Sequence, residues 1–235
     1  MTSQFDIDIK GFLESSFLDW PGQIATVIFL AGCNFRCPFC HNHGLVLNPN
    51  EYPVLNWDDI KARLKKFTGW IDGVVVSGGE PTISKGLPDL IRDIKNCGFK
   101  VKLDTNGSRP SVLADLMENG LLDHVAMDIK APLNEVAYAR AAGQPGFLDK
   151  VKESLALLQS SGLPFTLRTT VVPGIHTEKD ILLMARQLGG VPNWQLQYFN
   201  PENALDCSLR KLEPMNRDLF NLLDEKAHQI MEQSA

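Results

Sequence analysis

Three of the five cysteines in this 235-residue sequence lie within eight residues, at Cys33, Cys37 and Cys40. If five cysteines were placed at random, one fixed three-cysteine pattern would be expected about 0.002 times, so chance is a poor explanation. Three thiolates on one loop can hold three corners of an iron–sulfur cluster and leave the fourth iron without a protein ligand. The spacing therefore favours an iron–sulfur centre with one reactive iron.

A zinc site is the alternative reading of the same cysteines, with His41 or His43 as a fourth ligand. Structural zinc sites usually pair one CxxC with a second, separated pair of ligands, and Cys97 and Cys207 are single residues far along the chain. The pattern favours the cluster, and a zinc-binding interaction module stays open as the reading outside enzymes. Simple electron transfer fits less well, because such clusters have four protein ligands rather than three.

The loop with the cysteines follows the first of six segments that are predicted to be buried strands, and helix-like segments lie between them. The predicted strands cover residues 24–30, 71–76, 99–103, 124–129, 165–172 and 194–199. Such alternation implies parallel strands joined by right-handed crossovers. Six strands are too few for a closed eight-stranded barrel, so we expect an α/β fold that is a partial (β/α)6 barrel, with an open doubly wound sheet as the alternative.

Short polar motifs follow these predicted strands. SGGEP comes after the second strand, DTNG after the third, DIK after the fourth and Pro-Gly after the fifth. In both candidate folds, ligands bind beyond the carboxyl ends of the strands. We therefore expect the cluster and these motifs at the carboxyl-end face of the sheet.

Composition excludes several other classes of protein. Lys plus Arg number 23 against 28 Asp plus Glu, a net charge of −5, so the basic excess of a nucleic-acid binder is missing. The longest apolar stretch, residues 24–31, is too short to span a membrane, and the start MTSQFDIDIK does not resemble a signal peptide. We expect a cytoplasmic protein with one domain over residues 1–235, a core at about 20–200 and a helical tail at about 212–233.

Taken together, these motifs resemble those of a known family. CxxxCxxC with Phe39 before its last cysteine, followed by SGGEP, resembles the radical S-adenosylmethionine (SAM) enzymes. The longer string DWPGQIATVIFLAGCNFRCPFCHN, with DTNG and MDIK further on, is similar to the activating enzymes of glycyl radical enzymes. Among these, the resemblance is greatest to the activases of anaerobic ribonucleoside-triphosphate reductases, and it extends to the activases of pyruvate formate-lyase.

The resemblance implies a mechanism. Cys33, Cys37 and Cys40 would ligate a [4Fe-4S] cluster, and the amine and carboxylate of SAM would bind the open iron. One electron from the cluster would cleave SAM to methionine and a 5′-deoxyadenosyl radical, which would take a hydrogen atom from a glycine of a partner protein. The implied partners are a glycyl radical enzyme and, as electron donor, flavodoxin or ferredoxin. No direct contact with nucleic acid or membrane is expected.

The resemblance also implies cofactor-binding residues. Gly78 and Gly79, followed by Glu80, would let the backbone approach the methionyl part of SAM, because glycine has no side chain. Phe39 and His41 would lie against the adenine, although His41 equally fits an ordinary exposed loop.

Strand ends further along the chain would supply charged groups to the cofactor. Asp104, Thr105 and Asp128 would bind SAM and a monovalent cation beside its carboxylate, because hard oxygen ligands suit such an ion. Lys130 would contact the cofactor or neutralise these carboxylates. Arg168 would face the ribose.

Asn200 marks a departure from one member of the group. It lies where pyruvate formate-lyase activase has a histidine that contacts the cofactor, which counts against that identity. Activation of pyruvate formate-lyase or another glycyl radical enzyme nevertheless stays open, as does a small-molecule radical enzyme such as 7-carboxy-7-deazaguanine synthase. For a protein substrate, we expect a wide opening at the side of the incomplete barrel.

Overall fold

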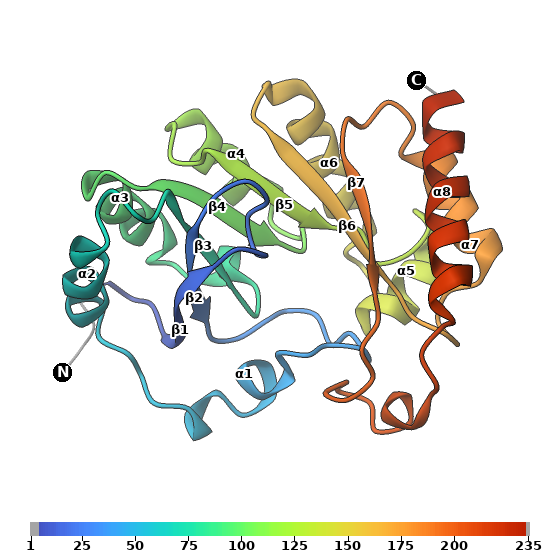
Figure 1. Ribbon diagram of the computed structural model, residues 1–235, viewed down its shortest axis with the longest axis horizontal. Helices are drawn as coiled ribbons and strands as arrows, with labels where there is room; N and C mark the ends of the chain where they lie inside the picture. The colour runs from blue at the N-terminus through green and yellow to red at the C-terminus, as the bar shows by residue number, and fades with distance from the viewer. Residues whose placement is uncertain (1–4, 234–235) are drawn as a thin grey trace.

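In the computed structural model, which describes residues 5–233, seven strands form one sheet whose order follows the chain (Figure 1). Strand β1 is antiparallel to β2, and each later pair of neighbours is parallel. Within residues 5–233 no pairing joins β7 back to β1, so the sheet stays open. The strands are β1 (Ile9–Ser16), β2 (Ala25–Leu30), β3 (Gly73–Gly78), β4 (Lys100–Thr105), β5 (His124–Asp128), β6 (Phe165–Val171) and β7 (Trp194–Tyr198).

Helices connect the parallel strands and lie around the outside of the sheet (Figure 1). Their ends follow the local sequence: Asn56 caps α2 by accepting from the Asp58 amide, and Thr177 forms a capping box with Asp180 at the start of α7. The helices are α1 (His43–Leu47), α2 (Trp57–Lys66), α3 (Leu87–Asn96), α4 (Pro110–Glu118), α5 (Glu135–Ala142), α6 (Leu148–Ser161), α7 (Glu178–Gln187) and α8 (Arg217–Gln233).

The expected α/β partial barrel with six parallel strands is confirmed, and the structure adds strand β1 and the short helices α1 and α5. Strand β1 precedes the six predicted strands, and register shifts on both sides of its Gly11–Leu13 segment interrupt the period-two pattern that would indicate a strand. Helix α5 lies between β5 and α6, in a connection that contains Pro132, Gly143 and Pro145. It is only eight residues long, capped by the Asn134 side chain and ended by Gly143 in the left-handed conformation.

The two faces of the sheet differ in chemistry. Residues that alternate along β4 to β6, such as Leu103, Val125 and Leu167, are buried in the main hydrophobic core beneath the helices. The residues between them point to the concave inner face and are mostly polar. In register, Asp128 lies beside Arg168, and Thr170 lies beside Gln197. The inner face of an open barrel is therefore a polar surface that a ligand can reach.

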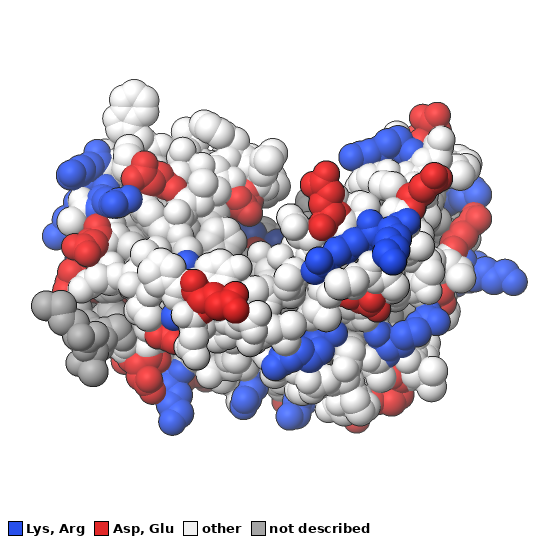
Figure 2. All heavy atoms as spheres, turned by 90° about the horizontal axis from the view of Figure 1, so that it is seen from below, with Lys and Arg blue, Asp and Glu red and all other residues white. Residues whose placement is uncertain are grey.

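The surface is hollowed by a notch between two lobes (Figure 2). In Figure 1 these lobes correspond to the side of β1 and α2 and to the side of β7 and α8. Within the described part of the chain, no helix is long and apolar enough to cross a membrane. The single-domain organisation, with its core at about 20–200 and tail at about 212–233, stays a prediction.

Candidate active site

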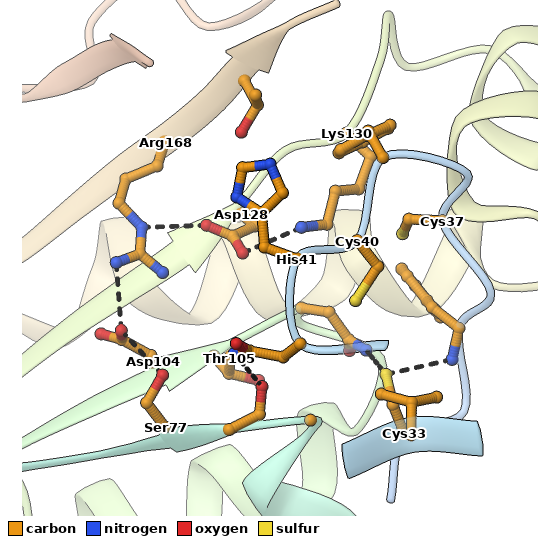
Figure 3. A pocket seen from close by; sticks show the side chains of 18 of the residues that line it. Cys33, Cys37, Cys40, His41, Ser77, Asp104, Thr105, Asp128, Lys130 and Arg168 are labelled. Carbon is orange, nitrogen blue, oxygen red and sulfur yellow. Dashed lines mark hydrogen bonds and ion pairs between the residues drawn. The ribbon is translucent and has the colours of Figure 1, made fainter. Parts of the chain in front are cut away.

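A cavity of about 390 Å³ lies at the carboxyl ends of the parallel strands (Figure 3). The loop between β2 and α1 closes one end of it, and the ends of β3 to β6 form its floor. Of the residues expected at the cofactor or cluster, those that line the cavity are Cys33, Cys37, Phe39, Cys40, His41, Gly78, Gly79, Asp104, Thr105, Asp128, Lys130 and Arg168. Glu80 and Asn200 are not among its lining residues.

The cysteine loop is fixed by main-chain contacts to distant parts of the chain. The Arg36 amide donates to the Ala142 carbonyl at the end of α5 (2.8 Å), and the Asp206 amide donates to the Pro38 carbonyl (2.8 Å). Within the loop, the Arg36 guanidinium donates to the Cys33 carbonyl at 2.6 Å. These bonds connect a loop without regular secondary structure to α5 and to the segment after β7, and so help to position its thiols.

Gly78 and Gly79 allow the end of β3 to approach this loop. Gly78 has φ of +115°, and a Cβ there would lie 2.3 Å from backbone atoms of Leu30. A Cβ on Gly79 would lie 1.8 Å from the Gly32 carbonyl oxygen. Both residues therefore have a structural requirement for glycine in addition to their place on the cavity wall. Their expected contact with the cofactor stays a prediction.

The three thiols fit an iron–sulfur cluster. They come from one loop and line one cavity, and within residues 5–233 no three His, Cys, Asp or Glu side chains are grouped to bind a single metal ion. Two N–H groups point at the Cys33 sulfur, from the Phe35 amide (3.3 Å) and the Asn106 side chain (3.8 Å). Hydrogen bonds of this kind tune the potential of a cluster.

Burial makes these thiols poor acids in the absence of iron. It raises the pKa of Cys33 to about 11 and that of Cys37 to about 12, and it raises the pKa of Cys40 as well. A buried thiolate needs a nearby positive charge. Iron supplies such a charge to a coordinating sulfur, so the site is suited to a metal cluster that binds with release of protons.

A chain of alternating charges crosses the floor of the cavity (Figure 3). Asp104 accepts from Lys102 at 2.5 Å and from Arg168 at 3.1 Å. Arg168 also donates to Asp128 at 2.9 Å, and Lys130 donates to Asp128 at 2.9 Å. Three cations and two carboxylates leave one net positive charge, which favours an anionic group of a ligand.

The ion pairs around Asp128 keep its carboxylate and the Lys130 ammonium charged at neutral pH. Removal from water would raise the pKa of Asp128, but the charges of Arg168 and Lys130 outweigh this and lower it to about 2. The pKa of Lys130 is raised because the Asp128 carboxylate outweighs the effect of burial. Protein cations thus already bind both carboxylates that were expected to bind a monovalent cation, and the Thr105 hydroxyl donates to Glu80 instead.

Glu80 lies beneath the cavity wall and is fully buried. Its carboxylate accepts from the Thr105 hydroxyl (2.7 Å), the Asn106 amide (2.6 Å) and both the amide and hydroxyl of Thr82. Burial raises the pKa of Glu80, and these four hydrogen bonds oppose the rise. The side chain joins the end of β3 to the loop after β4, and so positions Thr105 and Asn106 at the cavity.

Phe39 and His41 form an aromatic wall on the other side. The Phe39 ring lies edge-on to His176, with centroids 6.3 Å apart, and the Lys130 ammonium lies 5.8 Å from the Phe39 centroid. His41 stacks on Phe199 at 6.0 Å, and its Nε2 atom lies 2.7 Å from the Asn200 carbonyl oxygen. Asn200 therefore contacts the site through its backbone, whereas its side chain bonds to Glu202.

Several lining residues were missed in the sequence. Asn42, Ser77, Thr170 and Gln197 all line the cavity. Asn42 donates to the Gly78 carbonyl at 2.8 Å, and Ser77 donates to Asp104 at 3.2 Å. The signal for the strand residues was the alternation of polar and apolar residues, which places Ser77, Thr170 and Gln197 on the inner face of their strands.

An open parallel barrel with three cysteines at the carboxyl end of its first parallel strand defines a class of enzymes that bind an iron–sulfur cluster. Comparison with known proteins identifies the family: the Radical SAM superfamily profile matches residues 27–188. The chain belongs to this superfamily, whose members contain a [4Fe-4S] cluster and use SAM. It is therefore an enzyme, and the zinc-binding interaction module is excluded.

Two relatives refine this placement. A Methanocaldococcus jannaschii protein provisionally named a glycyl-radical enzyme activating enzyme is 33% identical over 216 residues, which cover 89% of this chain and 87% of the relative. The pyruvate formate-lyase-activating enzyme of Clostridium pasteurianum is 26% identical over 233 residues, covering 92% and 94%. The expected membership in the glycyl radical activase group is confirmed.

Solved structures agree with the fold. TYW1 with a lysine-pyruvate adduct bound has a TM-score of 0.61 at 16% identity, covering 87% of this chain and 73% of TYW1. Streptococcus suis SuiB bound to its precursor peptide SuiA has a TM-score of 0.65 at 15% identity, covering 88% of this chain but only 46% of SuiB. At such low identity the likeness concerns the fold alone.

Proposed function

We propose that this enzyme generates the glycyl radical of an anaerobic ribonucleoside-triphosphate reductase. The observation that carries the proposal is the meeting of the three cysteine thiols with the Gly78–Gly79 backbone and the charged floor in one cavity. The activase relatives support the general reaction. The sequence motifs, which most resemble the ribonucleotide reductase activases, support the choice of partner.

Each part of the cavity has a role in this proposal. Cys33, Cys37 and Cys40 hold the [4Fe-4S] cluster, and SAM lies against the backbone of Gly78 and Gly79. Once bound, the reduced cluster would supply the one electron for cleavage of SAM to methionine and a 5′-deoxyadenosyl radical, and the residues of this cavity would direct that radical to a glycine Cα hydrogen of the partner.

The charged floor binds and orients the cofactor. Lys130 is held by Asp128 at 2.9 Å, and its charge attracts the cofactor carboxylate. Arg168 is fixed by Asp104 and Asp128 and faces the ribose. Phe39 and His41 pack against the adenine and, with Phe35, exclude water from the reacting atoms.

The proposal also includes an electron donor, a cellular compartment and a monovalent cation. Flavodoxin or ferredoxin delivers the electron, and the enzyme works in the cytoplasm. A monovalent cation binds at Asp104, Thr105 and Asp128 beside the cofactor carboxylate, as a further ligand of carboxylate oxygens that also pair with Arg168 and Lys130. A rise in SAM affinity with K⁺ concentration tests this last point.

Activation of pyruvate formate-lyase is the second candidate. It is favoured by the Clostridium pasteurianum relative, which matches this chain over nearly the full length of both proteins. Asn200 counts against this second candidate. Its side chain bonds to Glu202, and only its backbone carbonyl contacts the site, through His41.

The decisive experiment compares candidate partners side by side. Anaerobically reconstituted enzyme, SAM and dithionite are incubated with anaerobic ribonucleoside-triphosphate reductase, with pyruvate formate-lyase, or with neither. We expect a glycyl radical signal in electron paramagnetic resonance spectra with the reductase alone. Cys40→Ser should abolish the signal, and the exposed Cys207→Ser should retain it. SAM cleavage without a radical on the reductase would show that the partner is wrong.

A further inference from the structure

We propose that the carboxamide side chains of Gln195 and Gln197 on β7, and of Asn193 directly before this strand, bind the main chain of an extended polypeptide segment of the partner. This inference rests on the proposed function, because that segment has to carry the reacting glycine. It adds the contacts that hold the segment and the direction from which it enters.

A second cavity of about 250 Å³ lies on the inner face of the open barrel. One wall is the loop after β1, with Leu18, Asp19 and Trp20, and the opposite wall is the open edge strand β7 with its carboxamides. This cavity therefore lies in the gap of the open barrel between β1 and β7, where the molecular surface is notched (Figure 2).

This cavity adjoins the cofactor cavity. Asp19, Arg168 and Gln197 line both of them. A segment that enters through the gap between the loop and β7 consequently passes Gln195 and Gln197 before it reaches Arg168 and the cofactor. The path is open at its outer end, because Asn193 and Gln197 are exposed to solvent.

The carboxamides have donors and acceptors left for a ligand. Asn193 donates to the Thr166 hydroxyl at 3.0 Å, which leaves its carbonyl oxygen as an acceptor. Gln197 accepts from the Thr170 hydroxyl at 3.3 Å, which leaves its amide group as a donor. Gln195 makes no side-chain hydrogen bond to any residue in the range 5–233, so both its groups remain. A peptide group offers one donor and one acceptor, which a carboxamide matches.

The spacing of the three residues matches that of an extended chain. Gln195 and Gln197 alternate with Trp194 and Leu196 along β7, so their side chains share one face and repeat about every 6.7 Å. Asn193 directly precedes the strand and lines the same cavity. The peptide groups on one edge of an extended segment repeat with the same period. Contacts to the main chain suit a glycine, which has no side chain to recognise.

The floor of the cavity combines the charged Lys102 and Arg168 side chains, which are paired with Asp104, with polar and aromatic groups. On the floor, His124 bonds to the Thr166 hydroxyl at 3.1 Å, and its imidazole ring lies 6.0 Å from that of Trp20. Desolvation, assisted by the charge of Lys102, lowers the pKa of His124, so this floor position is uncharged at neutral pH.

The rim of the cavity presents two large apolar side chains. Phe17 is 71% exposed and Leu18 is 88% exposed. Their loop is held by the Ser16 hydroxyl, which donates to Asp19 and accepts from the amides of Leu18 and Asp19. An ordered loop that exposes two such residues at the mouth of a cavity is suited to contact with a protein surface.

Steady-state kinetics with the full-length partner and reconstituted enzyme test the inference. Gln195→Leu removes one carboxamide that has no structural partner in residues 5–233, so the fold should be retained. We expect the KM for the partner protein to rise about tenfold with little change in kcat, because the contact holds the segment and does no chemistry. Leu18→Ala should raise the same KM. Gln159→Leu, at an exposed position on α6, is the matched control.

Two failures can be told apart. If the wild-type enzyme forms a glycyl radical and Gln195→Leu has the wild-type KM, the inference is wrong and the proposed function stands. If the wild-type enzyme forms no glycyl radical on any candidate partner, the proposed function fails and the inference falls with it. A loss of partner-independent SAM cleavage in Gln195→Leu would also overturn the inference, because the residue would then belong to the cofactor site.

Discussion

At the scale of single residues, the three cysteine thiols depend most strongly on a bound group. Burial raises the pKa of Cys33 to about 11 and of Cys37 to about 12. These thiols are therefore almost entirely protonated at neutral pH unless iron is present. The charged floor is the opposite case, because protein cations pair with both of its carboxylates and the pKa of Asp128 is lowered to about 2 without any ligand.

Thiol reactivity in iron-free protein tests this difference. At pH 8 a thiol with a pKa of about 11 is ionised in about one molecule in a thousand, and only the thiolate reacts with iodoacetamide. We expect Cys207, which is exposed, to be alkylated first and Cys33 and Cys37 at least about a hundredfold more slowly. Raising the pH toward 11 should accelerate the buried sites. Mass spectrometry of a timed alkylation gives the rate at each cysteine.

Unfolded protein provides the control for this prediction, since all five cysteines should react at similar rates in guanidinium chloride. Rapid alkylation of Cys33 and Cys37 in the folded protein at pH 8, at a rate close to that of Cys207, would show that the cysteine loop is open in the absence of iron.

At the scale of elements, the site depends on how closely the end of β3 approaches the cysteine loop. The Gly79 amide donates to the Leu30 carbonyl at 3.0 Å, and the Glu80 amide donates to the Gly32 carbonyl at 2.8 Å. These two bonds continue the β2–β3 pairing into the loop. A side chain at Gly79 would have to push the two elements apart.

Gly79→Ala should therefore destabilise the fold and loosen the cluster. The added Cβ would lie 1.8 Å from a backbone oxygen that has no room to move, so we expect a loss of about 3 kcal/mol or more in the free energy of unfolding. Gly69→Ala is the matched control: its φ is +86°, but nothing lies within 4 Å, so it should cost about 1 kcal/mol. Urea denaturation and the iron content after reconstitution measure both effects. Equal losses in the two variants would contradict the predicted clash.

Much of this arrangement was predictable from local patterns. The six parallel strands are short runs rich in β-branched residues, and the motifs that follow them contain most of the residues that line the cofactor cavity. Strand β1 was not predictable in the same way, because two register shifts break its alternation. The ion pairs among Lys102, Arg168 and the two aspartates depend on strand register, which a single sequence does not reveal. Gln195 and Gln197 carried a usable signal, the alternation in WQLQY, that points them to the inner face.

At the scale of the whole molecule, the cysteine loop links the two sides of the open barrel. The Gly32 amide donates to Leu45 on the N-terminal side, whereas the Pro38 carbonyl accepts from Asp206, beyond β7. His41 adds a contact to the Asn200 carbonyl. Because β7 and β1 are not paired within residues 5–233, a cluster that fixes this loop also stabilises the relative positions of the two sides.

Removal of the cluster should accordingly affect the loop and one distant segment selectively. Hydrogen–deuterium exchange of reconstituted and chelator-treated enzyme should show faster exchange without iron in residues 32–45, which contain the loop, and in residues 200–206, which are tied to it by the Asp206–Pro38 and His41–Asn200 hydrogen bonds. Helices α2 and α3 bury Leu64, Leu90 and Ile91 in the main core and should exchange at unchanged rates. Reconstitution with iron and sulfide should restore the slow exchange. If exchange rises evenly through the whole chain, the cluster stabilises the fold globally. If residues 200–206 do not respond, the loop does not couple the two sides of the barrel.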